Sequence, residues 1–143
     1  MIMKLVIEHA PVAKTRPRMA VFRGKATVYD IQSTLMRKIK MLFKKQMTAK
    51  GYLKLEEGPI FFKMTAHMPI PKTSAKKTLE MEGMPHTKRK DIDNIFKFYS
   101  DILNGVAYND DAQICSILCE KFYSSTPRVE IIIEEYKPKS QCW

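Results

Sequence analysis

The sequence predicts a small α/β (α+β) domain in which a mixed β-sheet packs against two main helices. Three runs, at residues 2–8, 58–68 and 128–136, alternate apolar and polar residues with the period of two that is typical of a half-buried strand. Two further runs, at residues 31–50 and 92–104, repeat apolar residues every three or four positions, as amphipathic helices do. A chain of 143 residues with this pattern favours one domain, expected at residues 1–136, with residues 137–143 as a disordered tail.

Composition narrows the class of protein. Hydrophobic residues make up 45% of the chain, enough for a real core, while no apolar run approaches the roughly 20 residues that cross a bilayer. The three cysteines are an odd set without the histidine partners of a zinc site, so neither a disulfide framework nor a structural zinc is expected. We therefore expect a cytoplasmic protein without a membrane partner, in which Cys115 and Cys119 are small buried residues.

Positive charge is concentrated in the first third of the chain. The formal net charge is +10, and residues 9–50 hold eleven basic residues against a single acid, Asp30, so this segment carries the whole excess. A surface that only keeps a protein in solution usually mixes both signs. The segment is therefore predicted to face a polyanion such as DNA.

A basic hairpin or extended arm is predicted after the first strand. Pro11 and Pro17 interrupt any helix here, and the Arg-Gly-Lys triplet at residues 23–25 separates two short β-prone runs. Arg16 and Arg18 flank Pro17 in extended chain, so both guanidinium groups can point to one side and bind phosphates.

The first main helix is predicted to run to about Lys50, with Asp30 or Ser33 as its N-cap. Its core-facing residues recur near the helical spacing and are Ile31, Leu35, Ile39, Leu42, Phe43 and Met47. The opposite face is basic and is interpreted as DNA-facing, with a merely solvated face as the alternative; it consists of Arg37, Lys38, Lys40, Lys44 and Lys45.

The strand predicted at residues 58–68 has one apolar face, made of Ile60, Phe62, Met64, Ala66 and Met68. The connection that follows, residues 69–90, is long for a compact domain, and such connections are usually functional or disordered. It contains a possible helical turn at residues 74–82 and six basic residues that lead into an acidic motif. We interpret it as a mobile loop that grips the substrate.

The second main helix is predicted at residues 92–104 and ends at Gly105. Its apolar stripe consists of Ile92, Ile95, Phe96, Tyr99, Ile102 and Leu103, and its polar face of Asp93, Lys97, Ser100, Asp101 and Asn104. Phe98 lies off both faces and is expected to pack against a second subunit. The last two strands, residues 112–122 and 128–136, are predicted to form a terminal pair joined through residues 124–127.

Four carboxylates lie close together in sequence inside this basic chain: Asp91 and Asp93 where the second helix begins, and Asp110 and Asp111 after its terminal turn. A carboxylate cluster repels DNA unless a divalent cation lies between them, and oxygen ligands without nearby His or Cys suit Mg²⁺ or Mn²⁺. Residues two apart lie roughly 200° apart on a helix, so Asp91 can share a metal with Asp93 only from extended chain before the helix. An N-cap role for Asp91 or Asp93 and a turn role for the Asp110–Asp111 pair are the alternatives, and the residues alone do not separate Asp110 from Asp111 as a ligand.

Two lysines accompany the acids. Lys97 lies one helical turn after Asp93, where it forms either a surface ion pair worth about 0.3–0.5 kcal/mol or a cation beside the scissile phosphate that offsets charge in the transition state. Beside a metal site we favour the second role. Lys121 shares the strand face of Asp111 but would lie roughly 33 Å from it along a continuous strand, so we assign it to DNA contact or structure rather than to catalysis.

At these residues the sequence resembles the RusA family of Holliday-junction resolvases. The match covers D-I-D-N-x-x-K at residues 91–97, D-I-L-N-G-V-A-Y-N-D-D-A-Q-I at residues 101–114, Lys121, and P-R-V-E-I at residues 127–131. It extends more loosely to K-T-R-P-R at residues 14–18, to Tyr29, and to M-P-I-P-K at residues 68–72. Lys90 departs from the family at a position where many relatives have proline, and Asp30 departs at one where threonine is common.

The resemblance implies a small α/β homodimer, RusA-like in fold, that binds four-way junction DNA and makes paired symmetric nicks with Mg²⁺, for which Mn²⁺ substitutes. The resemblance also implies that the metal-binding carboxylates are Asp91, Asp93 and Asp111 and that the catalytic lysine is Lys97. It also implies a bacterial or phage-encoded protein of the cytoplasm.

Together these observations predict a structure-selective endonuclease that acts in DNA recombination and repair. The residues expected to contact DNA are Lys14, Arg16, Arg18, Arg23, Lys72, Lys76, Lys77, Lys88, Arg89 and Lys90. Two alternatives stay open: a basic DNA-binding module whose acids only cap and turn, and a metal nuclease that acts mainly on flaps or single strands.

Overall fold

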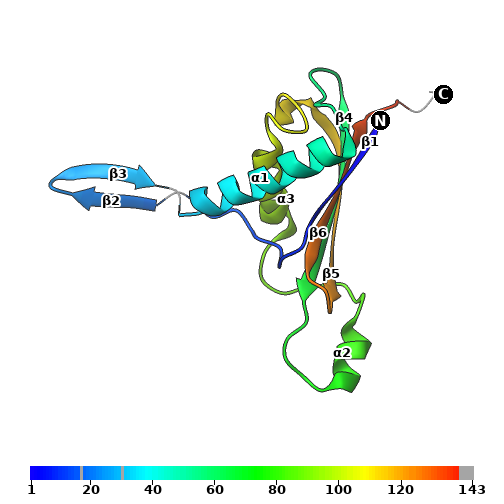
Figure 1. Ribbon diagram of the computed structural model, residues 1–143. Helices are drawn as coiled ribbons and strands as arrows, with labels where there is room; N and C mark the ends of the chain where they lie inside the picture. The colour runs from blue at the N-terminus through cyan, green and yellow to red at the C-terminus, as the bar shows by residue number, and fades with distance from the viewer. Residues whose placement is uncertain (17, 30, 139–143) are drawn as a thin grey trace, which may run out of the picture.

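A four-stranded mixed sheet with helices on one face forms the body of the protein, and two arms project from it (Figure 1). The computed structural model describes residues 1–16, 18–29 and 31–138. The elements are β1 (Ile2–Ile7), β2 (Arg18–Phe22), β3 (Lys25–Tyr29), α1 (Ser33–Lys50), β4 (Ile60–Pro69), α2 (Ala75–Met81), α3 (Ile92–Leu103), the 3-10 turn η1 (Asp111–Gln113), β5 (Ile114–Ser124) and β6 (Arg128–Glu135). The predicted α/β class, with a mixed sheet and two main helices, is confirmed. Of the expected tail, residues 139–143 lie outside the described residues.

The strand order in the main sheet is β1-β6-β4-β5. β6 is antiparallel to both β1 and β4, whereas β4 and β5 are parallel. The prediction that the last two strands pair with each other is wrong, because β4 lies between them. Parallel neighbours require a long crossover, and the chain between β4 and β5 supplies it through α3, so β5 lies beside β4 and β6 takes the other side.

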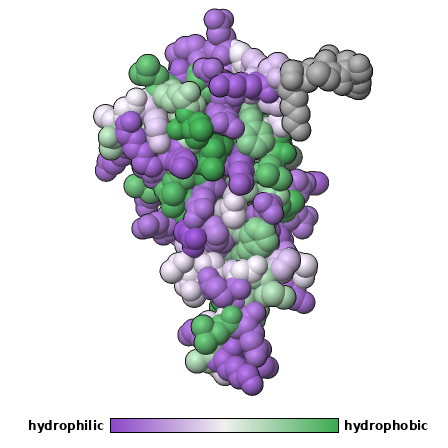
Figure 2. Space-filling view, turned by 90° about the vertical axis from the view of Figure 1, so that its right-hand side faces the viewer, coloured by the Kyte–Doolittle hydropathy of each residue, from purple (hydrophilic) through white to green (hydrophobic). Residues whose placement is uncertain are grey.

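The core lies between this sheet and the two helices α1 and α3. Alternate residues of three strands are buried on that side, as the period of two predicts: Met3, Leu5 and Ile7 of β1, Ile60, Phe62, Met64, Ala66 and Met68 of β4, and Val129, Ile131 and Ile133 of β6. Figure 2 looks onto the opposite side, where hydrophilic residues predominate and hydrophobic ones are interspersed. Within the described residues, the helices thus cover one face of the sheet (Figure 1 and Figure 2).

α1 contacts the core through a narrower stripe than the sequence suggests. Ile39, Phe43 and Met47 are buried, but Ile31, Leu35 and Leu42, which were expected beside them, are 39–51% exposed. These three buried residues are spaced four apart and form a single narrow face of the helix. That face is enough to cover the edge of the sheet that α1 contacts. The flanking apolar residues consequently remain on the surface.

The N-cap of α1 is Gln32 rather than Ser33, and its side chain makes no capping hydrogen bond. The amide of Gln32 instead accepts a hydrogen bond from the Thr15 backbone N–H at 3.0 Å and donates to the Ala13 carbonyl at 2.8 Å. Gln32 thus ties the start of the helix to the segment that leads into the first arm. The other candidate cap, Asp30, lies outside the described residues.

The first arm is the predicted basic hairpin, formed by β2 and β3. Arg23 and Gly24 at its tip both have positive φ, 49° and 74°, which is the type I′ geometry that matches the twist of a two-residue hairpin. Figure 1 shows the hairpin extending well beyond α1. Pro17, on which the expected alignment of Arg16 with Arg18 depends, lies outside the described residues.

The second arm contains α2 and lies in the predicted long connection. The Ser74 side chain caps α2 by accepting from the Lys77 N–H, which confirms the helical turn expected at residues 74–82. None of its residues is buried. The base of this arm is anchored where the Glu82 carboxylate accepts hydrogen bonds from the Ser125 backbone N–H at 2.6 Å and the Ser124 hydroxyl at 3.2 Å.

α3 has the predicted apolar stripe, but its buried arc is wider than expected. Phe98 is fully buried and meets Tyr99 edge to face at 5.0 Å, so the expectation that Phe98 packs against a second subunit is wrong. α3 contacts both α1 and the sheet, and a helix that is covered from two directions buries residues beyond a single stripe. Phe96 meets Phe62 of β4 edge to face at 5.1 Å, which fixes α3 against the centre of the sheet.

The backbone immediately before α3 has an unusual conformation. Lys90 has φ 77°, in the left-handed region that non-glycine residues rarely adopt. Asp91 follows in an extended conformation (φ −65°, ψ 139°) as the N-cap residue, and its side chain makes no capping hydrogen bond. The prediction that Asp91 lies before the helix proper is therefore confirmed.

None of the helices in the described part of the chain has the length and hydrophobicity needed to span a bilayer. Both described cysteines are free thiols. The expectation that they are buried is wrong for Cys115, which is exposed, while Cys119 is partly covered. β5 is the edge strand of the sheet, and Cys115 lies near its start, away from residues 83–86, which pair with the other end of β5.

Replacing Phe62 with alanine is expected to lower the free energy of unfolding by about 3–5 kcal/mol, because it removes a fully buried ring and its contact with Phe96. Urea denaturation measures this change. Leu79→Ala on α2 is the control, because Leu79 is 79% exposed and its loss should change stability by less than about 0.5 kcal/mol. Similar losses in the two variants would contradict the described core.

Lys90→Pro is expected to destabilise the protein by about 2–3 kcal/mol, since proline locks φ near −65° and Lys90 has φ 77°. Lys90→Gly should stay within about 1 kcal/mol of the wild type, because glycine adopts positive φ without strain. Thermal unfolding of both variants distinguishes these outcomes, and equal stability of the two would rule out the left-handed conformation.

Candidate functional site

Polar residues follow one face of α3 from its beginning to its end. Asp93, Lys97 and Asp101 are spaced four residues apart, and Asn104 ends the helix as its C-cap. Residues at this spacing share a helix face, and Asn104 lies eleven positions after Asp93, which corresponds to about 16 Å along the axis. Lys97 lies between the two acids on this face and is exposed.

The first acidic pair, Asp91 and Asp93, lines a shallow pocket at the beginning of α3. Its volume is about 570 Å³, and its other walls come from residues 86–88 of the second arm and residues 119–122 of β5. Lys88 of the connection and Lys121 of β5 are among these residues. Of the basic residues in the connection, Lys88 thus lies in the pocket that the first acidic pair lines.

The two members of the second acidic pair, Asp110 and Asp111, differ in their hydrogen bonds. Asp110 is the N-cap of η1, and its carboxylate accepts a hydrogen bond from the Ala112 N–H at 3.0 Å in a capping box with Gln113. This bond lowers the pKa of Asp110. A hydrogen bond with the Asp110 side chain, followed by partial burial, raises the pKa of Asp111. Asp110 is thus engaged in the turn, whereas Asp111 is not part of the cap.

Asp111 lies at the other end of α3 from the first pair. Its side chain interacts with the Asn104 side chain, and the charge of Asp101 contributes to its raised pKa. Asp101 itself lies 4.0 Å from the Lys14 ammonium. Among the described residues, no group of three or more His, Cys, Asp or Glu side chains could hold a metal ion.

The donor chemistry of the pocket fits a hard divalent cation only in part. Asp91 and Asp93 present carboxylate oxygens, the ligands that Mg²⁺ prefers, at one surface of the chain. The third carboxylate that the family resemblance implies, Asp111, is not among the residues that line this pocket. One chain, as far as it is described, therefore brings together two of the three implied ligands.

The root of the first arm is tied directly to α3. The backbone N–H of Val12 donates to the Tyr99 hydroxyl at 3.1 Å, and the N–H of Lys14 donates to the Asn94 carbonyl at 2.9 Å. The ammonium of Lys90 donates to the Pro11 carbonyl at 2.8 Å. These bonds place the base of the basic hairpin next to the start of α3.

The residues predicted to contact DNA fall into two groups. Lys14 and Lys90 have protein partners, as described above. The others with described side chains are exposed on the two arms and on the segment before α3: Arg16, Arg23, Lys72, Lys76, Lys77, Lys88 and Arg89. The side chain of Arg18 lies outside the described parts of the structure.

Sequence reasoning missed His86 as a neighbour of the acids. His86 lines the same pocket and packs against the Tyr123 ring at 4.7 Å. Burial, followed by the charges of Lys121 and two further lysines, lowers the pKa of His86. No sequence pattern marks this residue, because it reaches the pocket only through pairing of residues 83–86 with β5.

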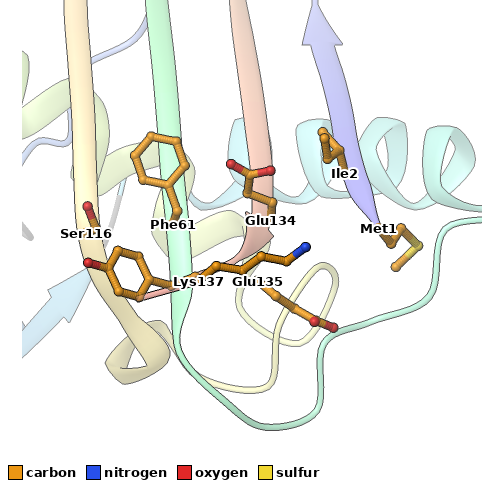
Figure 3. Close-up of a pocket in the computed structure, with 8 residues that line it drawn as sticks. Met1, Ile2, Phe61, Ser116, Glu134, Glu135 and Lys137 are labelled. Atoms are coloured by element: carbon orange, nitrogen blue, oxygen red, sulfur yellow. The ribbon is translucent and has the colours of Figure 1, made fainter. Parts of the chain in front are cut away.

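A larger cavity of about 690 Å³ lies at one end of the sheet, beside the first residues of the chain and residues 134–137 (Figure 3). It is lined by Met1, Ile2, Phe61, Ser116, Glu134, Glu135, Tyr136 and Lys137. None of these residues belongs to the predicted site or to the polar face of α3. Size alone therefore does not identify the functional site, and the acidic pocket at α3 is the better candidate on chemical grounds.

Comparison with known proteins relates most of the chain to one family. The family model of endodeoxyribonuclease RusA matches residues 8–134, which include both arms, both acidic pairs and Lys121. A relative from Bacillus subtilis (strain 168), described as uncharacterized protein YqaN, is 32% identical over 138 residues, which cover 92% of this chain and 95% of the relative. The chain therefore belongs to the RusA family of endodeoxyribonucleases, which resolve Holliday junctions by hydrolysing phosphodiester bonds.

Proposed function

We propose that this protein resolves four-way DNA junctions by paired, symmetric nicks that require Mg²⁺. The observation that carries the proposal is the pocket at the start of α3, where Asp91 and Asp93 lie beside Lys88 and Lys121 in a chain of the RusA family. A carboxylate pair surrounded by basic residues suits a polyanionic substrate held next to a cation. In this proposal the protein works in the cytoplasm of a bacterium or of a phage-infected cell.

Asp91, Asp93 and Asp111 are the proposed metal ligands. Nucleases of this family depend on a divalent metal, and carboxylate oxygens favour Mg²⁺, with Mn²⁺ as a substitute. The bound ion would supply charge stabilisation and a more acidic water. Asp111 is preferred to Asp110 because the Asp110 carboxylate is already engaged as the cap of η1.

The remaining chemistry belongs to side chains of the chain itself. Lys97 lies one turn after Asp93 on the exposed face of α3, where its ammonium can offset negative charge that develops on the phosphate. Exposed basic residues of the two arms bind the phosphates of the junction and hold its strands against α3. Positioning of the scissile phosphate between these arms is the contribution of the fold.

Two copies of the chain are part of the proposal. Two symmetric cuts require two sites, which a dimer with twofold symmetry supplies. The roughly 16 Å between Asp93 and the Asn104 end of α3, where Asp111 lies, gives a second reason. In a dimer, a second chain can bring its Asp111 to the pocket that Asp91 and Asp93 line.

Asp93→Asn is expected to reduce nicking of a synthetic four-way junction by at least about 100-fold, because it removes a ligand charge while keeping the side-chain shape. Junction binding measured in EDTA should stay within about threefold of the wild type. Asp110→Asn is the matched control, because asparagine also caps helices well and Asp110 is not a proposed ligand. Unchanged nicking by purified Asp93→Asn protein would refute the assignment and favour a non-catalytic DNA-binding module.

Purified protein should cut a four-way junction in Mg²⁺ and should not cut it in EDTA, while linear duplex of the same sequence should remain intact. Junction, flap, single-strand and linear substrates compared on one gel measure this selectivity. Binding should also weaken steeply with salt, because many phosphate contacts release counterions. Equal cleavage of linear duplex would contradict junction resolution, and preferential cleavage of flaps or single strands would identify another kind of metal nuclease.

A further inference from the structure

The side chain of Lys121 holds the backbone that leads into the acidic pocket. Its ammonium donates hydrogen bonds to the carbonyl oxygens of Lys88 at 3.0 Å and Lys90 at 2.9 Å. Lys121 lies on β5, more than thirty residues away in sequence from both carbonyls. One charged group thus joins two backbone positions immediately before Asp91, and such charge-assisted bonds are stronger than neutral ones.

The Lys121 side chain binds the segment before α3 at the point where the pairing of that segment with β5 ends. Residues 83–86 run along the free edge of β5, with Gly83 N–H donating to Tyr123 O at 2.8 Å, Tyr123 N–H to Met84 O at 2.9 Å, and His86 N–H to Lys121 O at 3.0 Å. Past His86 the segment leaves the strand edge and crosses towards α3. The Lys121 ammonium bonds to the chain within this crossing segment.

The crossing segment ends in a conformation that needs support. Lys90 has φ 77°, and strained backbone of this kind persists where its surroundings hold it. Two lysine side chains do so here, because Lys121 binds the Lys90 carbonyl and the Lys90 ammonium binds the Pro11 carbonyl. Asp91 follows directly in extended chain, and its carboxylate makes no capping bond that would orient it.

We propose that Lys121 is a positioning residue that sets the orientation of Asp91 relative to Asp93. The inference rests on the proposed function of these two carboxylates. Asp93 belongs to α3, which fixes its position. The orientation of the Asp91 carboxylate relative to that of Asp93 therefore depends on the backbone of residues 88–90, which Lys121 binds. Losing the ammonium frees both carbonyls to turn towards water, and Asp91 then samples orientations in which the two carboxylates no longer converge.

Lys121→Met tests the proposal, because methionine keeps an unbranched side chain but cannot donate. The single-turnover rate at saturating junction should fall about 30- to 100-fold, while the dissociation constant in EDTA and its salt dependence stay within about threefold. Hydrogen exchange without metal should become about tenfold faster in residues 87–91 and stay unchanged in α3. Lys121→Arg can still donate to both carbonyls and should recover most of the rate.

Lys54→Met is the matched control, because Lys54 pairs with Glu56 at 3.4 Å outside this site and its loss should leave rate and exchange unchanged. An unaltered rate in Lys121→Met would overturn the proposal. Weakened binding with a reduced salt slope and a normal rate at saturation would also overturn it, since Lys121 would then be a phosphate contact. If Lys121→Met does not fold, Lys121→Ala, which also cannot donate, replaces it with the same expected outcome and the same refutation.

Asp93→Asn, measured alongside, separates this proposal from the proposed function. Wild-type nicking by Asp93→Asn would refute the function of the acidic pair itself. Loss of nicking in Asp93→Asn together with full activity and unchanged exchange in Lys121→Met would refute only the role given to Lys121.

Discussion

The parallel pairing of β4 with β5 is the constraint on which the rest of the architecture depends. Parallel neighbours cannot be joined by a tight turn, so the chain must travel back along the sheet before β5 begins. It does so through α3, which covers the sheet face and packs against Phe62 through Phe96 (Figure 1). Because α3 runs back along the sheet, Asp91 and Asp93 lie at its beginning, whereas Asp111 lies against Asn104 at its end. Acids that are neighbours in sequence therefore lie at opposite ends of one helix.

The parallel pairing also brings Lys121 to the start of α3. β5 runs in the same direction as β4, so its last residues lie at the end of the sheet where β4 ends and the second arm begins. Lysine ammonium groups at this end bind backbone carbonyls as well as facing solvent, as Lys121 and Lys90 show. Some lysines thus hold the backbone near the acids. The exposed basic residues of the arms are the proposed phosphate contacts.

The acidic pocket is a surface feature of a single chain, open on one side and formed by elements that project from the sheet. Two of its walls, the second arm and the segment before α3, bury little apolar area, and hydrogen bonds to β5 and to Pro11 hold them in place. Segments held mainly by hydrogen bonds can change conformation around a large, charged substrate more readily than a packed core can. The fold thus combines a rigid helix, which holds Asp93 and Lys97, with a tethered segment that holds Asp91.

The sequence by itself determined the class of fold, the main strand and helix positions, the hairpin, and the extended position of Asp91 before α3. These features follow from local periodicity, from glycine and proline positions, and from the angle between neighbouring residues on a helix. Only the tertiary structure decided that β4 separates β5 from β6, that Phe98 is buried, that Ile31, Leu35 and Leu42 are exposed, and that Asp111 does not join Asp91 and Asp93 within one chain. It also decided that Lys121 meets Lys88 and Lys90. The physical reason is that each of these depends on which surfaces of distant segments meet, and a periodic pattern states that a face is apolar without stating what covers it.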